Sequence, residues 1–227
     1  MGRKSGDMPS HPGRHHLASP GVRMCESTIN PRGPIEVRLA RNAIDRDEVF
    51  RLRHRVLGEQ GGHMARGLTL SNGRLVEHAD SGADLFAAFD PNGRALAAVR
   101  RQPLMDVLAA SDRYEPLRHV AMQLGGDIGT MSVSGRFIID PAPGGANLAL
   151  RVFASMLRAG AREGITHDLC WCDESRLHGR LRLGYADAQV RMLDDLGEPS
   201  KILTLGIAAK VSGPNSIIRL VRRVIAA

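Results

Sequence analysis

The sequence contains few aromatic residues, few cysteines and no long apolar segment. Five Phe, two Tyr and one Trp occur among 227 residues, so aliphatic residues and Met must form most of the core. No apolar run approaches the roughly 18 residues that a membrane-spanning helix needs. The amino-terminal region also lacks the apolar segment of a signal peptide. We therefore expect a soluble protein of the cytoplasm.

The cysteines exclude a zinc-binding or disulfide-linked small domain. Cys25, Cys170 and Cys172 are odd in number and have no repeated spacing, whereas zinc sites and disulfide frameworks use paired cysteines. The histidines show no spacing typical of a metal site or a catalytic triad. The sequence therefore predicts no bound metal, and it predicts buried free thiols in a reducing compartment.

Positive charge is in excess and comes mainly from arginine. Lys and Arg total 31 against 24 Asp and Glu, which gives a formal net charge of +7 and a pI near 10.1. Arginine suits carboxylates and phosphates, so we expect an acidic substrate or partner. Nucleic acid is the other candidate for a basic protein, but the scarcity of aromatic residues and of any recognisable binding motif argues against it.

Composition divides the chain into three parts. Residues 1–34 carry five Pro, five Gly and three His without a hydrophobic period, which predicts a disordered leader. Residues 35–210 have the periodicity of one folded domain. Residues 211–227 predict a basic amphipathic helix, which could cover the domain's own core, lie on a membrane surface or bind an acidic acyl-carrier protein. We expect it to cover the core.

Periodicity within 35–210 predicts an α/β domain of α+β character, with a mixed sheet and helices on its faces. A strand, a helix beginning at a cap on Asp45, and a polar loop up to Asp84 come first. Two apolar runs around Pro91-Asn92-Gly93 then predict a hairpin. The remaining expected elements are a short helix at 105–120, a strand at 130–140, a helix at 147–164, a strand at 165–172, a helix at 173–184, and strands at 185–193 and 200–208.

A glycine-containing turn follows the strand that ends at Asp140. It reads Pro141-Ala142-Pro143-Gly144-Gly145-Ala146-Asn147. Glycines let the backbone approach a ligand, and the amino end of the following helix favours an anion by roughly 0.3–1 kcal/mol. Gly and Pro are equally standard in an ordinary strand-to-helix turn. The residues alone therefore fit both a phosphate-binding turn and a plain one.

This turn, together with a later Leu183-Gly184-Tyr185 segment, resembles the GNAT superfamily of acetyltransferases. The superfamily's donor-binding motif is Gln/Arg-x-x-Gly-x-Gly/Ala, on which Gly144 and Ala146 fall, and its late signature is Leu-Gly-Phe/Tyr. The resemblance covers residues 35–209 and implies a GNAT-like mixed, largely antiparallel central sheet flanked by helices. It also implies that Gly144, Gly145, Ala146 and Asn147 bind an acyl-thioester donor.

Within the superfamily the sequence is most similar to the autoinducer-synthase branch, which comprises acyl-homoserine lactone synthases and N-acyl amino acid synthases. Arg53 falls on the arginine of that branch's Arg-x-x-x-Phe motif, and Glu77 and Asp80 have the spacing of its Asp-x-x-Asp pair. Arg100 falls on the arginine of that branch's Arg-Leu-x-Pro motif. Arg136 falls on the arginine of Glu-x-Ser-Arg-Phe.

The resemblance implies an N-acyltransferase that moves an acyl group from acyl-CoA or an acyl-carrier-protein thioester to the amine of a small molecule such as an amino acid. Glu77 and Asp80 would then hold the acceptor's ammonium group or take its proton. Arg53, Arg100 and Arg136 would bind an acceptor carboxylate or orient those two carboxylates.

The thioester carbonyl would be supported by a main-chain amide of Phe137, Ile138 or Ile139. Two departures from the family pattern support a second hypothesis, however. Val133 stands where the family has a glutamate implicated in catalysis, and Pro141 stands in the basic place of the donor motif. The alternative is a GNAT-like module that binds an acyl thioester or a protein partner without catalysis.

Overall fold

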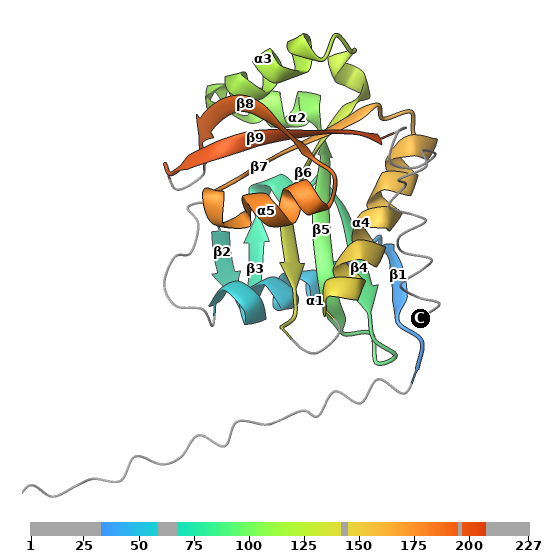
Figure 1. Cartoon of the computed structure of the whole chain (residues 1–227). Helices are drawn as coiled ribbons and strands as arrows, with labels where there is room; N and C mark the ends of the chain where they lie inside the picture. Colours follow the sequence, from blue (N-terminus) through green and yellow to red (C-terminus); the bar gives the residue numbers. More distant parts are fainter. Residues whose placement is uncertain (1–32, 59–67, 142–144, 195–196, 208–227) are drawn as a thin grey trace, which may run out of the picture. The chain divides into compact units, whose positions relative to one another are not determined.

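The computed structural model describes residues 33–58, 68–141, 145–194 and 197–207 (Figure 1). The predicted leader at 1–34 lies almost entirely outside these residues. The predicted helix at 211–227 and the turn residue Gly144 lie outside them as well.

The described residues form nine strands and five α-helices, joined by four short helical segments. The strands are β1 (Glu36–Leu39), β2 (Leu68–Ser71), β3 (Arg74–Glu77), β4 (Asp84–Phe89), β5 (Ala95–Pro103), β6 (Met131–Ile139), β7 (His167–Cys172), β8 (Ala186–Leu193) and β9 (Pro199–Gly206). The α-helices are α1 (Ala43–Arg53), α2 (Leu104–Ala110), α3 (Glu115–Gln123), α4 (Gly145–Arg162) and α5 (Glu174–Arg182). The short segments are the π-helical η1 (His54–Gly58) and the 3₁₀-helical η2 (His78–Asp80), η3 (Asp112–Tyr114) and η4 (Ile128–Thr130).

Seven strands form one sheet in the order β1-β4-β5-β6-β7-β9-β8, and β2 pairs with β3 in a separate hairpin. Within the described part of the chain, β6 and β7 are the one parallel pair, and the other neighbours run antiparallel. This arrangement confirms the predicted mixed, largely antiparallel sheet with flanking helices.

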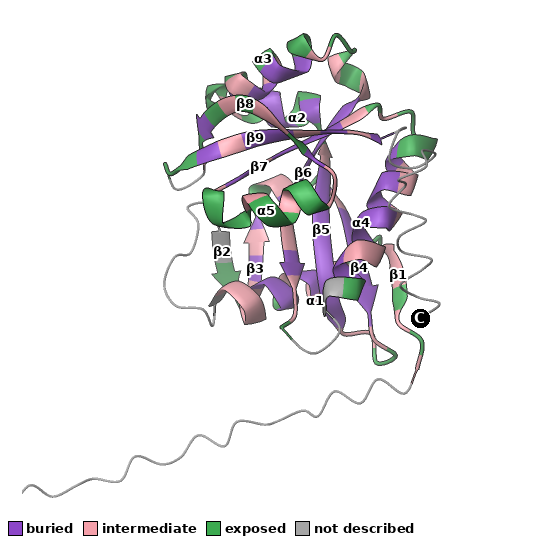
Figure 2. Ribbon diagram, in the orientation of Figure 1, coloured by how far each residue is buried: buried purple, intermediate pink, exposed green. Residues whose placement is uncertain are grey.

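The strands β4 and β5 are buried along almost their whole length (Figure 2). Their near-continuous apolar sequence reflects this position, because helices cover both faces of the sheet at its centre. The predicted turn between them is confirmed: Gly93 has φ of +80° and its amide donates to the Asp90 carbonyl over 2.9 Å.

Three local predictions were wrong. The stretch expected as a polar loop before Asp84 contains the β2–β3 hairpin, whose turn residues Asn72 and Gly73 both have positive φ, as a tight hairpin turn requires. Helix α1 is capped by Asn42, which accepts a hydrogen bond from the Asp45 amide over 2.8 Å, so Asp45 lies in the first turn instead. The single short helix expected at 105–120 is divided between α2, η3 and α3.

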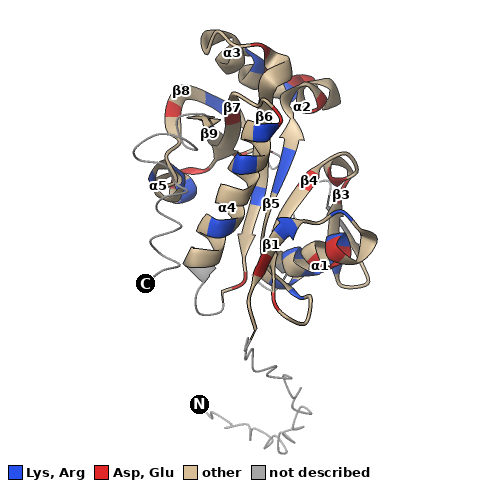
Figure 3. Ribbon diagram, turned by 90° about the vertical axis from the view of Figure 1, so that its right-hand side faces the viewer, with Lys and Arg blue, Asp and Glu red and all other residues tan. Residues whose placement is uncertain are grey.

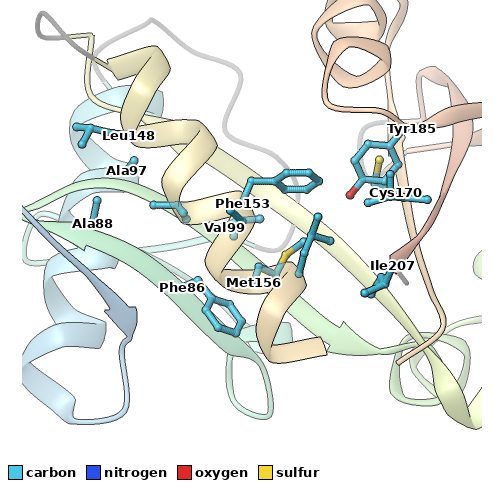
Figure 4. Packing of buried hydrophobic residues seen from close by; sticks show 14 of the residues in the cluster. Phe86, Ala88, Ala97, Val99, Leu148, Phe153, Met156, Cys170, Tyr185 and Ile207 are labelled. Carbon is cyan, nitrogen blue, oxygen red and sulfur yellow. The ribbon is translucent and has the colours of Figure 1, made fainter. Parts of the chain in front are cut away.

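Two layers of helices cover the sheet, with one hydrophobic cluster beneath the first layer and two beneath the second. Phe153 and Met156 of α4 pack with Phe86 and Val99 of the sheet on one face, where Tyr185 and Cys170 close the cluster (Figure 4). Helix α5 contributes Leu177 to this same face. On the opposite face α1 packs over β4 and β5, and α2 and α3 pack over β6 to β9.

The strands β6 and β7 pair over only three residues. Their register begins at Met131 with His167 and ends at Val133 with Leu169, although β6 continues to Ile139 and β7 to Cys172. Figure 1 shows the two strands diverging beyond that point. Among the described residues, the carboxyl half of β6 therefore has a partner strand, β5, on one side only.

Candidate active site

The backbone of β6 is distorted where the two strands separate. Ala98 of β5 lies opposite Ile138, whereas Arg100 lies opposite Gly135, so β6 contains one extra residue at this point, as in a β-bulge. Arg136 lies in the bulge with φ of +50°, a left-handed conformation that few residues other than glycine adopt. From this bulge the Arg136 side chain reaches Glu77, the last residue of β3.

The two predicted carboxylates lie together at the end of β3. Glu77 is the last residue of β3, and the single turn η2 brings Asp80 back so that its Oδ2 accepts the Glu77 amide over 2.8 Å. Both side chains are buried, with Asp80 only 1% exposed. The polar stretch that sequence reasoning treated as a loop is thus a hairpin that carries these two groups into the domain.

Three predicted arginines meet these carboxylates, which we call together the arginine–carboxylate cluster (Arg53, Glu77, Asp80, Arg100 and Arg136). Arg53 on α1 donates from Nη1 to Asp80 over 2.6 Å. Arg100 on β5 donates to Glu77, and its Nη1 lies 3.4 Å from Asp80. Arg136 donates from Nε to Glu77 over 2.7 Å and also from Nη2. Five residues from five elements (α1, β3, η2, β5 and β6) therefore form one largely buried charged network.

The arginines keep both carboxylates ionised. Burial opposes the charged form of Glu77, but the hydrogen bond and charge of Arg136, with the charge of Arg100, outweigh it and hold the pKa of Glu77 below its ordinary value. Burial likewise opposes ionisation of Asp80, and the hydrogen bond and charge of Arg53 lower its pKa. Carboxylates with a lowered pKa are weak proton acceptors.

Arg53 has unused donors inside this network. The residue is 1% exposed, and its Nε and Nη2 have no hydrogen-bond partner in the described part of the chain. Buried polar groups are normally paired, so each exception requires an explanation.

The predicted donor-binding segment lies on the separated half of β6. The Asp140 amide donates to the Leu96 carbonyl over 2.8 Å, toward β5. Because main-chain groups alternate in direction along a strand, the Ile139 amide is directed to the side where β7 no longer pairs. Phe137 packs against the α4 cluster and Ile138 against the α1 cluster, so these consecutive residues alternate between the two faces.

The strand-to-helix turn is described in part. Gly145 and Ala146 begin α4, a helix of 18 residues, and Asn147 is exposed in its first turn, while Gly144 falls in the part that is not described. Figure 3 shows Lys and Arg residues along α4 and on neighbouring elements. Helix α4 therefore begins directly after the glycine-containing turn, which is where an anion-binding helix terminus was predicted.

Sequence reasoning missed a second polar group on the other face of β6, the hydroxyl–carboxyl network (Ser132, Ser134, Asp168 and Tyr185). Ser132 donates to Asp168 over 2.6 Å, Tyr185 donates to its other oxygen over 2.5 Å, and the Ser134 and Tyr185 hydroxyls lie 2.9 Å apart. Burial raises the pKa of Asp168 above its ordinary value. An acidic residue within the apolar β7 sequence was the signal that could have revealed it.

Val133 lies in apolar surroundings between these two polar groups. It is 4% exposed and packs with Met131, Leu169 and Met192. No acid therefore stands in the place of the family's glutamate. Any proton transfer at this site must use another group.

Neither a metal site nor a membrane span appears within the described ranges. None of the His, Cys, Asp and Glu residues there are grouped so as to hold a metal ion. None of the helices there combines the length and apolar character needed to cross a bilayer. Cys170 and Cys172 are free and buried on the same face of β7, as predicted, while Cys25 lies outside the described residues.

Comparisons with known proteins place the fold. No protein-family model and no curated protein matches the sequence. Among solved structures, the CoA-dependent acyl-homoserine lactone synthase BjaI, solved with MTA, has a TM-score of 0.62 and 17% identity, with 85% of this chain and 89% of that one covered. FeeM, an N-acyl amino acid synthase from uncultured soil microbes, has a TM-score of 0.54 and 14% identity, with 80% and 93% covered.

A smaller acetyltransferase shares the same architecture. The putative N-acetyltransferase from Lactobacillus plantarum has a TM-score of 0.56 and 13% identity, covering 77% of this chain and 99% of that one. At identities this low the likeness establishes the fold. The chain has the GNAT-like fold that acyl-homoserine lactone synthases and N-acyl amino acid synthases share.

Proposed function

We propose that the protein is an N-acyltransferase, which transfers an acyl group from a thioester donor to the amine of a small molecule such as an amino acid. One observation carries the proposal: the arginine–carboxylate cluster is buried beside the bulge of β6, where that strand separates from β7. Charged groups are thereby held within reach of a strand whose amides are free to meet a thioester carbonyl.

In this reaction the amine nitrogen attacks the thioester carbonyl carbon, a carbon–nitrogen bond forms and the carbon–sulfur bond breaks. The electron pair leaves with sulfur as a thiolate, and the amine loses its proton. An oxyanion forms on the way and needs a fixed donor, for which the Ile139 amide is directed toward the correct side of β6. Loss of one such donor costs about 2.7–4 kcal/mol in other enzymes.

The carboxylates bind the acceptor. Glu77 and Asp80 remain ionised because the arginines lower their pKa values, so they would attract the ammonium form of the acceptor, whose proton leaves to water before the amine attacks. The acceptor's own carboxylate would pair with the free Nε and Nη2 of Arg53. Arg100 and Arg136 orient Glu77 rather than bind the acceptor, since their donors already reach it.

The donor would enter from the α4 side. Phe137, Ile138 and Ile139 would border its thioester, and the amino end of α4, with Gly144, Gly145, Ala146 and Asn147, would meet its phosphate. Acyl-CoA and an acyl-carrier protein present the same pantetheine thioester, so both remain candidate donors. The domain carrying this site would span 35–210, without a metal.

Val133 favours one alternative, a module that binds an acyl thioester or a protein partner without transferring the group. Its place in an apolar cluster removes the acid that would act as a base. An assay of thiol release from thioester donors separates the two functions. Thermal stabilisation by a thioester without thiol release, for every amine tried, would support the binding module and contradict the transferase.

The test is thiol release from acyl-CoA and acyl-carrier-protein thioesters of several chain lengths, with amino acids and simple amines as acceptors. We expect release that depends on the amine, and an amide product of matching mass. Glu77→Gln should lower kcat/KM by about 10²-fold or more, because it removes a buried negative charge that would hold the acceptor's ammonium group.

A matched control comes from an exposed pair of the same chemistry. Glu115 accepts from Arg118 over 3.0 Å at the surface, and Glu115→Gln should leave kcat/KM unchanged. Equal rates for Glu77→Gln and the wild type would remove Glu77 from the site.

A further inference from the structure

Arg180, near the carboxyl end of α5, brings a positive charge to the place where β6 and β7 separate. Its guanidinium carbon lies 5.1 Å from the centroid of the Phe137 ring, on the unpaired half of β6. The residue is half-buried. Its Nη1 is buried and has no hydrogen-bond partner among the described residues. A buried guanidinium nitrogen without a partner is costly to retain, and a ligand that supplies an acceptor would account for it.

The charge of Arg180 also reaches β7. Burial raises the pKa of the Cys170 thiol to about 12, and Arg180 is the strongest of the charges acting on that thiol, opposing the rise. Its charge also acts on Asp168 and Tyr185. The guanidinium thus lies over Phe137, on the face of the sheet where Phe137, Cys170 and Tyr185 belong to one cluster.

Phe137, which Arg180 covers, is distant along the chain from the proposed phosphate-binding turn. Phe137 precedes Pro141 by four residues, which is about 13 Å of extended strand. Arg180 therefore does not substitute for the basic residue of the donor motif, whose place Pro141 occupies. Arg180 lies instead over Phe137, next to the bulge at Arg136. The segment 137–139, whose amide would meet the thioester carbonyl, begins there.

We propose that Arg180 binds the sulfur of the acyl donor and stabilises the thiolate that leaves during transfer. The inference rests on the proposed function. When the carbon–sulfur bond breaks, the electron pair remains on sulfur and its negative charge pairs with the guanidinium. The amine's proton leaves through the carboxylate side, and the thiolate takes a proton from water after release. No other reactant is needed. A charge-assisted contact of this kind strengthens as the bond breaks, which is what accelerates a reaction.

The test compares two donors that carry the same acyl group but release different thiols. One is the alkyl thioester of N-acetylcysteamine, whose thiolate is poorly stabilised, and the other is an aryl thioester of thiophenol, whose thiolate is stable by itself. Arg180→Gln should lower kcat/KM about 10²-fold with the alkyl donor, the size of effect for one transition-state contact. With the aryl donor it should lower kcat/KM less than about threefold.

Arg176→Gln is the matched control, because Arg176 lies on the same helix, is exposed and pairs with Asp173 at 3.5 Å. It should match the wild type with both donors. Arg180→Met keeps an apolar stem over Phe137 while removing the charge, so it must show the same contrast if the Gln variant fails to fold.

Equal losses with the two donors would show that Arg180 acts on structure or general binding, and would overturn the inference. A full rate for Arg180→Gln with the alkyl donor would overturn it as well, while leaving the proposed function intact. A wild-type protein that transfers no acyl group from any thioester would contradict the proposed function, and this inference with it.

Discussion

Two buried polar groups lie on opposite faces of the same strand, and their carboxyl groups behave in opposite ways. In the arginine–carboxylate cluster, Glu77 and Asp80 contact three guanidinium groups and their pKa values are lowered. In the hydroxyl–carboxyl network, Asp168 accepts hydrogen bonds from the hydroxyls of Ser132 and Tyr185, and burial raises its pKa. The partner, more than the degree of burial, decides whether a carboxyl group in this domain is kept charged.

Under the proposed function, this difference would separate a site for chemistry from a structural contact. The carboxylates that the arginines hold in their charged form would meet the acceptor's ammonium group. A carboxyl group that favours its neutral form serves to join β6, β7 and the Tyr185 segment just before those strands separate. The following predictions test this comparison, beginning with the largest expected effect.

Removing the arginine that pairs with Asp80 should destabilise the protein strongly. Arg53→Met leaves Asp80, which is 1% exposed, as a buried charge with one cation fewer. Breaking a buried ion pair in this way costs about 3–5 kcal/mol. Urea unfolding should show this loss as a lower midpoint. Arg118→Met, which breaks an exposed pair, should cost at most about 1 kcal/mol. Similar losses for the two variants would mean that the cluster is not buried as described.

Glu77 should stabilise the protein at neutral pH and not in acid. Its folded-state pKa lies below the ordinary value of 4.5, so its contribution is present above about pH 4.5 and is lost as the pH falls through the folded-state pKa. Glu77→Gln should therefore be less stable than the wild type at pH 7, with the difference narrowing in acid. A difference that is constant between pH 7 and pH 3 would contradict the lowered pKa.

Asp168 should show the opposite sign and a smaller effect. Its folded-state pKa is raised above the ordinary 3.8, so its contribution is complete below about pH 3.8 and is lost as the pH rises through the folded-state pKa. The free energy of unfolding of Asp168→Asn, measured relative to the wild type, should therefore increase between pH 4 and pH 7. A relative decrease over that range would show that Asp168 is held ionised.

Much of the fold could be predicted from the sequence because its signals are local. The strand pair around Pro91-Asn92-Gly93 and the helix expected at 173–184 follow from local turn and capping chemistry, and the structure has both, with Asp173 as the helix cap. The β2–β3 hairpin was also encoded locally by Asn72-Gly73. It was overlooked because the surrounding residues are polar, and half of such a hairpin faces solvent.

The candidate site was only partly accessible to such reasoning. A family resemblance singled out Arg53, Glu77, Asp80, Arg100 and Arg136, but periodicity does not show that residues so far apart in sequence meet in one network. The left-handed backbone at Arg136 depends on the register between β5 and β6, a tertiary property. The position of Arg180 over Phe137 depends likewise on how α5 packs.

The most direct test of the whole account is amide hydrogen exchange with and without a thioether analogue of an acyl-pantetheine, which keeps the arm common to both candidate donors and cannot be cleaved. We predict slower exchange at 137–139 of β6 and in α5, together with little change in β1 and β8. Binding that leaves β6 unprotected, or that protects the edge strands β1 or β8 instead, would contradict the claim that the donor binds where β6 and β7 separate.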